Sequence, residues 1–375
     1  MIINNAKVYR NGHFESASIE FDSHIRSFSP SEGMDACGAY IIPGLIDVHT
    51  HGAMGIDASD CTSEQIHHLA QFYSDNGVTS FCFTTLTVPA DELRSAMKNI
   101  RAYERFGGEA KCAGVHLEGP FVSRGKCGAQ NPDNIRKPDI ALFNELNELS
   151  GGIVRLITVA PEAEGALDFI REASKVCTVS LGHSTADYEQ AMAGFEAGAT
   201  HVTHLFNGME PFHHRKPGLV GAALTAGANV ELICDGVHIH PAMILAVHKM
   251  FGDRLIIVSD SLRCAGLCDG RYNLGGLPMI VRDGRATLLD GTIAGSSSNL
   301  LQELRNVVSY GVPLEAAVKA ATETPAKDIG VFDSIGSLDV GKCADFLVLN
   351  KDLKLMATFI DGRLVNGTTD FESVK

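Results

Sequence analysis

The sequence predicts an α/β protein: a (β/α)8 barrel of the TIM type, joined to a small β-sandwich domain that both chain ends form. Three observations support this prediction. Short apolar segments alternate with helical patterns through the middle of the chain. The two ends carry a different pattern, of short strands and tight turns. Histidines and carboxylates follow several of the central strands.

The two ends of the chain have the pattern of a small β-sheet. Residues 2–42 are short alternating segments broken by turns such as Asn11-Gly12. Near the C-terminus, apolar runs at 344–349 and 357–360 precede the turn Asp361-Gly362 and a further run at 363–365. Asp-Gly between apolar runs is a strong hairpin signal. We therefore expect residues 1–45 and 341–375 to form one small β domain, and residues 46–340 to form the barrel.

The middle of the chain alternates between strand-like and helix-like segments. The strand candidates are short, apolar and followed by turn residues; they are 44–48, 79–84, 113–117, 154–159, 176–181, 201–204, 230–234 and 255–258. Helical patterns lie between most of them, for instance at 63–75, 91–106, 163–174 and 185–197. Eight strands alternating with helices is the count of a barrel. A doubly wound sheet is the alternative, but no glycine-rich dinucleotide-binding turn follows the first strand.

Composition excludes several kinds of partner. The chain has 375 residues, is 45% hydrophobic and carries a formal net charge of -14. This charge argues against nucleic acid as a partner, whereas an anionic small molecule would need a local cluster of donors. The chain start lacks a secretion signal, and no apolar stretch has the length of a membrane span, so we expect no membrane partner.

The ten cysteines indicate a reducing compartment. They include no CxxC pair, and the closest spacing is between Cys264 and Cys268. Cys82, Cys177 and Cys234 sit inside apolar runs, where a cysteine acts as a small buried hydrophobe. We therefore expect a cytoplasmic protein.

Polar residues at five strand ends predict a metal site. In a barrel, residues just after the C-terminal end of a strand point into the active site. The residues found there are His49 and His51 on the first strand, Glu118 on the third, His183 on the fifth, His204 on the sixth and Asp260 on the eighth. Any one histidine could be a hydrogen-bonded structural residue, but all five strand ends lie on the same rim. Imidazole and carboxylate together form a ligand set for zinc, iron or manganese.

Five other histidines are not candidates for this site. His67 and His68 lie in the middle of a helical pattern, and His13, His24 and His248 lie outside any strand end. We expect them at the surface or in local hydrogen bonds.

Motifs along most of the chain resemble the N-acetylglucosamine-6-phosphate deacetylase family of the amidohydrolase superfamily. The opening motif is PGLIDVHTHG at 43–52. The others follow in order: HLEGPF at 116–121, GHS at 182–184, THLFNGM at 203–209, RKPG at 215–218, DGVH at 235–238, SDS at 259–261, GTIAGS at 291–296 and GKCAD at 341–345. The resemblance covers nearly the whole chain, and its motifs are specific to the family.

The resemblance implies a role for each matching residue. Glu118, His183 and His204 would bind a divalent metal, and Asp260 would be the catalytic acid–base. Substrate contacts would come from Ala129, Gln130, Asn207, Gly208, Arg215, His238, Ile293, Ala294 and Gly295. The metal would be zinc, with iron or manganese as alternatives.

Two features depart from some members of the family. His49 and His51 are both present, so a second metal is plausible. Gln130 stands where other members have a histidine, and glutamine can donate a hydrogen bond but cannot become cationic. The number of metals, one or two per subunit, stays open at this point.

The resemblance implies hydrolysis of N-acetylglucosamine 6-phosphate to glucosamine 6-phosphate and acetate. The same chemistry on N-acetylgalactosamine 6-phosphate is an alternative, because the two sugars differ only at C4. A cyclic amidase of the superfamily is a further alternative, but strand four ends in 158–162 without the lysine that many of those enzymes use. A non-catalytic binding protein would be expected to have lost part of the site. The family further implies a homodimer, with Arg215 serving its own or the neighbouring site.

Overall fold

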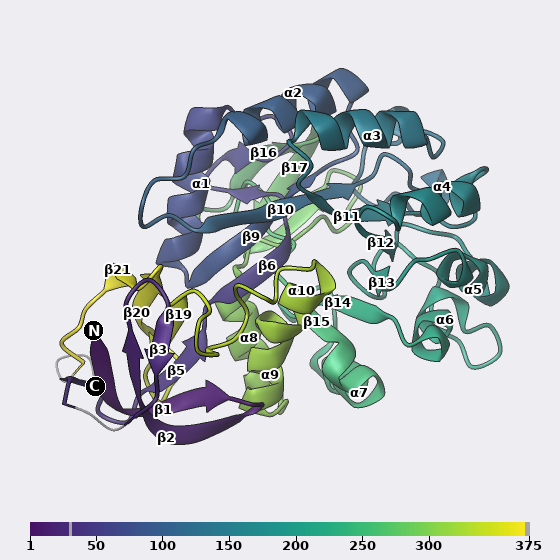
Figure 1. Cartoon of the computed structure of the whole chain (residues 1–375). Helices are drawn as coiled ribbons and strands as arrows, with labels where there is room; N and C mark the ends of the chain where they lie inside the picture. Colours follow the sequence, from purple (N-terminus) through teal and green to yellow (C-terminus); the bar gives the residue numbers. More distant parts are fainter. Residues whose placement is uncertain (30–31, 372–375) are drawn as a thin grey trace.

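Eight parallel strands close into a barrel in the computed structural model, which describes residues 1–29 and 32–371 (Figure 1). In order around the barrel they are β6 (Leu45–Thr50), β9 (Val78–Thr85), β10 (Lys111–Glu118), β11 (Val154–Val159), β12 (Thr178–Leu181), β13 (His201–Val202), β14 (Asn229–Ile233) and β15 (Leu255–Val258). Beyond the last strand, the N–H of His51 donates to the carbonyl of Ser261 over 2.8 Å, which joins the eighth segment to the first. The predicted barrel is confirmed.

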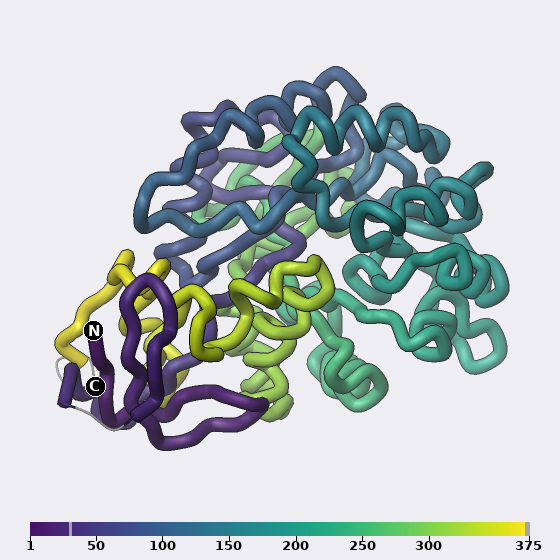
Figure 2. The backbone as a smooth tube through the Cα atoms, in the orientation of Figure 1, coloured from purple at the N-terminus to yellow at the C-terminus, as the bar shows by residue number. Residues whose placement is uncertain are grey.

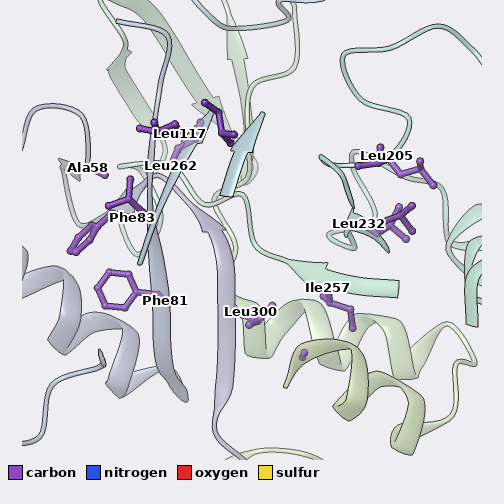
Figure 3. Close-up of a cluster of buried hydrophobic side chains, with 14 of the residues drawn as sticks. Ala58, Phe81, Phe83, Leu117, Leu205, Leu232, Ile257, Leu262 and Leu300 are labelled. Atoms are coloured by element: carbon purple, nitrogen blue, oxygen red, sulfur yellow. The ribbon is translucent and has the colours of Figure 1, made fainter. Parts of the chain in front are cut away.

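The barrel strands form because they are buried on both faces. Every residue of β6 and β9 is buried, as expected for a parallel sheet covered by helices outside and filled by side chains inside. The rings of Phe81 and Phe83 lie 4.7 Å apart between their centroids. Figure 3 shows part of this core, including Phe81, Phe83 and Leu117.

Helices connect the strands and cover the outside of the barrel. They are α1 (Ser63–Asp75), α2 (Ala90–Ala102), α3 (Ile140–Leu149), α4 (Ala166–Ala173), α5 (Tyr188–Glu196), α6 (Gly218–Ala226), α7 (Pro241–Phe251), α8 (Leu300–Ser309), α9 (Leu314–Ala321) and α10 (Glu323–Asp328). Short 3-10 turns occur at Arg124–Lys126, Pro132–Asn134 and Gly252–Arg254. Among the described residues, no helix is long and apolar enough to cross a membrane.

Local capping explains where the helix boundaries differ from the sequence prediction. Helix α5 begins at Tyr188 rather than at 185, because Asp187 caps it and forms a capping box with Gln190. Helix α4 begins after Gly165, which adopts a left-handed conformation. Helix α2 ends four residues early, where Tyr103 becomes extended.

Both chain ends contribute to a second sheet. Its strands are β1 (Ile2–Arg10), β2 (His13–Phe21), β3 (Ile25–Ser27), β4 (Met34–Asp35), β5 (Tyr40–Pro43), β19 (Phe346–Leu349), β20 (Leu355–Ile360) and β21 (Arg363–Gly367). Figure 2 shows the purple N-terminal and yellow C-terminal tubes together at one side of the molecule. The last four residues of the predicted domain, 372–375, lie outside the described residues.

This terminal sheet curls over a core of its own. Phe21 on β2 and Phe346 on β19 are separated by two strands in the sheet order, yet their ring centroids lie only 4.9 Å apart. Phe346 in turn stacks on Phe359 of β20 at 4.5 Å. Side chains from distant strands therefore meet across the fold, which is the packing of a sandwich.

A small insertion follows β15 and reaches the mouth of the barrel. It is the antiparallel sheet β16 (Gly270–Leu274), β17 (Leu277–Arg282) and β18 (Arg285–Leu288), in which β16 turns into β17 through Gly275 and Gly276. A second small hairpin, β7 (Gly52–Ala53) with β8 (Ile56–Asp57), follows the first barrel strand. These elements were not predicted from the sequence, and the loop after β18 contributes to the site described next.

Candidate metal centre and active-site cavity

The structure brings the six strand-end side chains together at one end of the barrel. His49 lies within β6, and His51 is the first residue after that strand. Glu118 ends β10, whereas His183, His204 and Asp260 each follow their strand by two residues. All six are buried.

Glu118 lies at the centre of this group. Its Oε1 is 3.1 Å from His183 Nε2 and 2.9 Å from His204 Nε2, and the two Nε2 atoms are 3.1 Å apart. Its Oε2 is 3.2 Å from His51 Nε2, and its Oε1 is 3.4 Å from His49 Nε2. One carboxylate therefore faces two histidine pairs, one through His183 and His204 and the other through His49 and His51.

Asp260 stands beside the second pair. Its Oδ1 lies 3.2 Å from His51 Nε2 and 3.5 Å from His49 Nε2. The backbone N–H of Asp260 donates to the carbonyl of His49 over 2.9 Å, which fixes the distance between the two strand ends.

Hydrogen bonds at Nδ1 fix the orientation of three of the imidazole rings. His183 Nδ1 donates to the carbonyl of Lys126 over 2.9 Å, and His51 Nδ1 to the carbonyl of Thr84 over 3.1 Å. His49 Nδ1 donates to a carboxylate oxygen of Glu231 over 2.8 Å. Because each proton is held at Nδ1, the lone pair of Nε2 points into the cluster, as it does in histidines that bind metals.

The backbone is strained at three of these residues. His183, His204 and Asp260 have φ angles of 45°, 26° and 46°, in the left-handed region that residues with a side chain rarely adopt. Such a conformation costs on the order of 1–3 kcal/mol per residue and persists where the surroundings impose it, often at functional sites. Here it follows the end of each strand and turns the side chain toward Glu118.

The charges of neighbouring histidines keep the two carboxylates of the cluster ionised. Burial would raise the pKa of Glu118, but His49 and His183 beside it hold that pKa well below its usual range. Burial likewise would raise the pKa of Asp260, and His49 and His51 lower it instead. Both carboxylates are therefore ionised, surrounded by imidazole nitrogens.

These residues fit a divalent metal. Two overlapping sets, His49, His51 and Glu118, and Glu118, His183 and His204, each place their ligand atoms within 4.8 Å of one another. The buried Nε2 of His49 has no hydrogen-bond partner among the described residues, which leaves its lone pair for a ligand. Nitrogen and carboxylate donors of this kind suit zinc, iron or manganese.

A cavity of about 200 Å³ opens next to the cluster. Eight of the nine side chains or backbone segments expected to contact substrate line it: Ala129, Gln130, Asn207, Gly208, His238, Ile293, Ala294 and Gly295. Leu262, Leu86 of the β9–α2 connection and Leu274 of β16 supply apolar walls. The cavity thus combines the cluster, polar groups and apolar surface in one enclosure.

Gln130 joins the cluster to the loop after β9 through hydrogen bonds at both ends of its amide. Its amide nitrogen donates to Glu118 Oε2 over 2.5 Å, and its amide oxygen accepts from the N–H of Thr87 over 2.6 Å. An amide nitrogen carries two donor hydrogens, so one remains after the bond to Glu118.

His238 is held between two acceptors. Its Nδ1 lies 2.7 Å from a carboxylate oxygen of Asp235, and its Nε2 lies 2.7 Å from the carbonyl of Ala294. Burial would lower the pKa of His238, but the bond to Asp235 raises it. A cationic imidazolium at the cavity wall is therefore favoured.

Arg215 does not join the cavity in its own chain. It is exposed, its Nη1 lies 2.7 Å from His214 Nε2, and it lines a different surface hollow with Tyr188 and Glu210. The sequence motif could not indicate this separation, because it fixes neighbours along the chain and not the direction of a loop.

Sequence reasoning missed Glu231, which bonds both to His49 and to the backbone of His204. The sequence nevertheless contains a signal for this residue. A single carboxylate interrupts the otherwise apolar stretch from Val230 to Cys234, and a charge in the middle of a buried strand requires a partner.

Comparison with known proteins agrees with this geometry. The amidohydrolase family model matches residues 40–365. An N-acetylglucosamine-6-phosphate deacetylase from Vibrio furnissii is 37% identical over 330 residues, covering 87% of this chain and 82% of that protein. An N-acetylgalactosamine-6-phosphate deacetylase from Escherichia coli O157:H7 is 36% identical and covers 87% and 88%.

A solved structure has the same fold over its full length. It is a mutant N-acetyl-D-glucosamine-6-phosphate deacetylase from Mycobacterium smegmatis in complex with N-acetyl-D-glucosamine-6-phosphate, 30% identical with a TM-score of 0.90, covering 98% of this chain and 99% of that one. The family match spans the barrel, the cluster at its mouth and the part of the terminal sheet that begins at β5. The chain therefore belongs to the amidohydrolase family.

Proposed function

We propose that this protein hydrolyses the acetamide of N-acetylglucosamine 6-phosphate, giving glucosamine 6-phosphate and acetate. The observation that carries the proposal is Glu118 among four imidazoles, with Asp260 3.2 Å from one of them, at the wall of a cavity. Relatives with this activity in their names match most of the chain. The protein is a metal-dependent hydrolase in this proposal.

Glu118, His183 and His204 would hold one divalent cation, and His49, His51 and Glu118 a second. We favour zinc, with iron or manganese as alternatives, and two ions per subunit rather than one. A cation bound there lowers the pKa of a water molecule to roughly 7 and polarises a carbonyl group.

Asp260 is the proposed acid–base. Its carboxylate is ionised, so it can accept a proton at Oδ from the attacking water. The same oxygen then delivers that proton to the amide nitrogen, because an amine leaves far more readily than an amide anion. The strained backbone of Asp260 and its bond to His49 keep the carboxylate at the cavity wall.

The remaining cavity residues would bind and orient the sugar phosphate. The free donor of Gln130 is available to the acetyl oxygen, and the apolar wall near Leu262 to its methyl group. The backbone near Asn207 and Gly208 would offer donors to the anionic end of the substrate, and His238, whose two nitrogens are already bonded, would contribute its charge in a chain of net charge -14.

Arg215 requires a second subunit in this proposal. It lies outside the cavity of its own chain, so we propose a homodimer in which Arg215 reaches the phosphate in the neighbouring site. We further propose a cytoplasmic location, since all ten cysteines are unpaired and lie within the described residues. The proposed domains are 1–45 with 341–375, and 46–340; β5 ends at Pro43 and β6 starts at Leu45.

Acetate release from four compounds tests the function. The compounds are N-acetylglucosamine 6-phosphate, its galactosamine counterpart and the two unphosphorylated sugars. We expect release to be fastest from the first and to stop when a chelator removes the metal. Faster release from the galactosamine compound would support the second candidate, which the Escherichia coli relative favours. Equal rates with and without phosphate would overturn the proposed phosphate contacts.

A further inference from the structure

A line of charged side chains runs down the inside of the barrel from the metal cluster. Glu231 on β14 is fully buried, and its Oε2 accepts from His49 Nδ1 over 2.8 Å and from the backbone N–H of His204 over 3.0 Å. Its other oxygen, Oε1, lies 3.3 Å from His201 Nε2. One carboxylate thus contacts a candidate ligand from each of the two overlapping metal sets.

The line continues to the opposite end of the barrel. His201 Nδ1 donates to Asp328 Oδ2 over 2.7 Å, and Asn229 Nδ2 donates to the other oxygen of Asp328 over 2.7 Å. His201 and Asn229 are the first residues of β13 and β14, and Asp328 ends α10, which lies next to these strands in Figure 1. We call Glu231, His201 and Asp328 the buried carboxylate–histidine chain.

Stability does not account for this chain of charges. Taking ionised groups out of water is costly, and a well-packed apolar set of similar volume is often as stable as a buried ion pair. The strand positions around Glu231 are already apolar: Val230, Leu232 and Ile233. A charge retained among them therefore points to a role beyond packing.

The bonds of Glu231 explain that role. The bond from Nδ1 of His49 to Glu231 fixes the ring so that its Nε2 faces Glu118 at 3.4 Å. The ring of His116 packs edge-on against the His49 ring, with centroids 4.6 Å apart, and limits its rotation. The bond to the N–H of His204 acts at a strained position, where φ is 26°.

The far end of the chain keeps Glu231 in place. Burial would lower the pKa of His201, but Asp328 and Glu231 raise it to about 10. His201 is then an imidazolium that faces a carboxylate at each nitrogen. The side chain of Asp328 is only 2% exposed, so water does not compete for its bond to His201, whereas His201 Nε2 and Glu231 Oε1 are in charge contact without a hydrogen bond.

We propose that Glu231, held by His201 and Asp328, is a positioning residue that orients His49 and His204 toward Glu118 and so sets the affinity of the metal centre. Carboxylates that hold a metal-binding imidazole at its second nitrogen typically contribute 10–100-fold to metal affinity. The inference rests on the proposed metal centre and adds to it a group that touches neither metal nor substrate.

Zinc affinity of the full-length protein, measured by competition with a chelator, tests the inference. Glu231→Gln keeps the size of the side chain but removes its charge. The amide N–H₂ would then face one of the three nitrogens around Glu231, which are His49 Nδ1, the backbone N of His204 and His201 Nε2. We expect zinc binding about 10–100-fold weaker than in the wild type. Unchanged affinity would overturn the proposal.

Glu303→Gln is the matched control. Glu303 on α8 is as fully buried as Glu231, and burial raises its pKa well above the usual range, so the same substitution removes little charge. We expect its zinc affinity to stay at the wild-type value. An equal loss in both variants would mean that Glu231 acts only on the stability of the barrel.

Three further measurements keep the inference testable. In a His49→Ala background, Glu231→Gln should weaken zinc binding less than it does in the wild type, because the ring that it orients is gone; an equal loss would overturn positioning through His49. If Glu231→Gln does not fold, Asp328→Asn takes its place, with a loss of several-fold expected and an unchanged affinity overturning the chain. A wild-type protein that binds no zinc, iron or manganese would overturn the metal centre itself.

Discussion

Asp260 and Glu118 are both buried carboxylates in contact with His49 and His51, yet their surroundings indicate different roles. Both line the cavity, but Glu118 is surrounded by four imidazoles and the amide of Gln130, whereas Asp260 lies next to Gly295, where an added Cβ would lie 2.9 Å from Asp260 Oδ1. Glu118 is therefore placed to hold a cation, and Asp260 to reach the substrate.

Asp260→Asn separates these roles. The amide keeps the shape of the side chain but cannot accept a proton, so we expect kcat to fall about 10²–10⁴-fold. Metal content should stay near that of the wild type. Glu118→Gln serves as the contrasting variant and should lose metal, as elemental analysis of both purified proteins would reveal. Near-normal turnover in Asp260→Asn would refute its assignment as acid–base.

For single residues, the sequence alone identified members of the site wherever a polar residue follows an apolar strand. His183, His204 and Asp260 were found in that way, because parallel strands bring their carboxyl ends to one rim. Glu231 and Asp328 were not, since their partners are set by the register between strands and by a helix almost 100 residues further along. Such pairings depend on tertiary packing, which local patterns do not encode.

Helix α5 illustrates how much of an element the sequence determines. Its core face and its existence follow from the spacing of apolar residues, whereas its start depends on one side chain. The carboxylate of Asp187 accepts from the N–H of Gln190, and the Gln190 side chain accepts from the N–H of Asp187. The predicted start at 185 was early because Thr185 instead bonds to Glu162.

Asp187→Ala should destabilise the protein by about 1 kcal/mol, because the backbone N–H of Gln190 loses its side-chain acceptor. Urea unfolding at neutral pH would measure the change in the free energy of unfolding. Asp352→Ala, at an exposed position outside the helices, is the control and should change it by less than about 0.5 kcal/mol. Equal stabilities of the two variants would show that the capping box contributes nothing here.

The insertion β16–β18 shows the limit of pattern reading for elements. Its strands alternate more buried with more exposed residues and each carries one arginine, unlike the barrel strands β6 and β9, which are buried throughout. Pairs such as Gly275-Gly276 and Asp283-Gly284 are turn signals that would have suggested a meander. Leu274 and the loop after β18 nonetheless line the cavity, so this element helps to define the site.

For the whole molecule, the terminal sheet and the barrel are joined by a charged contact. Lys111 at the start of β10 lies 2.7 Å from Asp345 Oδ2 and 2.6 Å from Asp361 Oδ1, and Arg105 lies 2.6 Å from Asp361 Oδ2. Both aspartates belong to the C-terminal segment, which was predicted to pair with the N-terminus. The sequence could not predict that this segment also forms ion pairs with the barrel, because no local pattern relates Lys111 to Asp345.

Lys111→Met should destabilise the protein by about 3 kcal/mol at pH 8, because it leaves the 5% exposed Asp345 carboxylate without its cation. Burial already raises the pKa of Asp345, and loss of Lys111 would raise it further. A carboxyl whose pKa is higher in the folded than in the unfolded chain stabilises the fold as pH falls and it takes up a proton. The difference in Tm between wild type and variant should therefore shrink from pH 8 to pH 5. Lys111→Met combined with Asp345→Asn should recover much of the loss at pH 8, whereas a Tm difference that stays constant with pH would show that Asp345 is not the group left uncompensated.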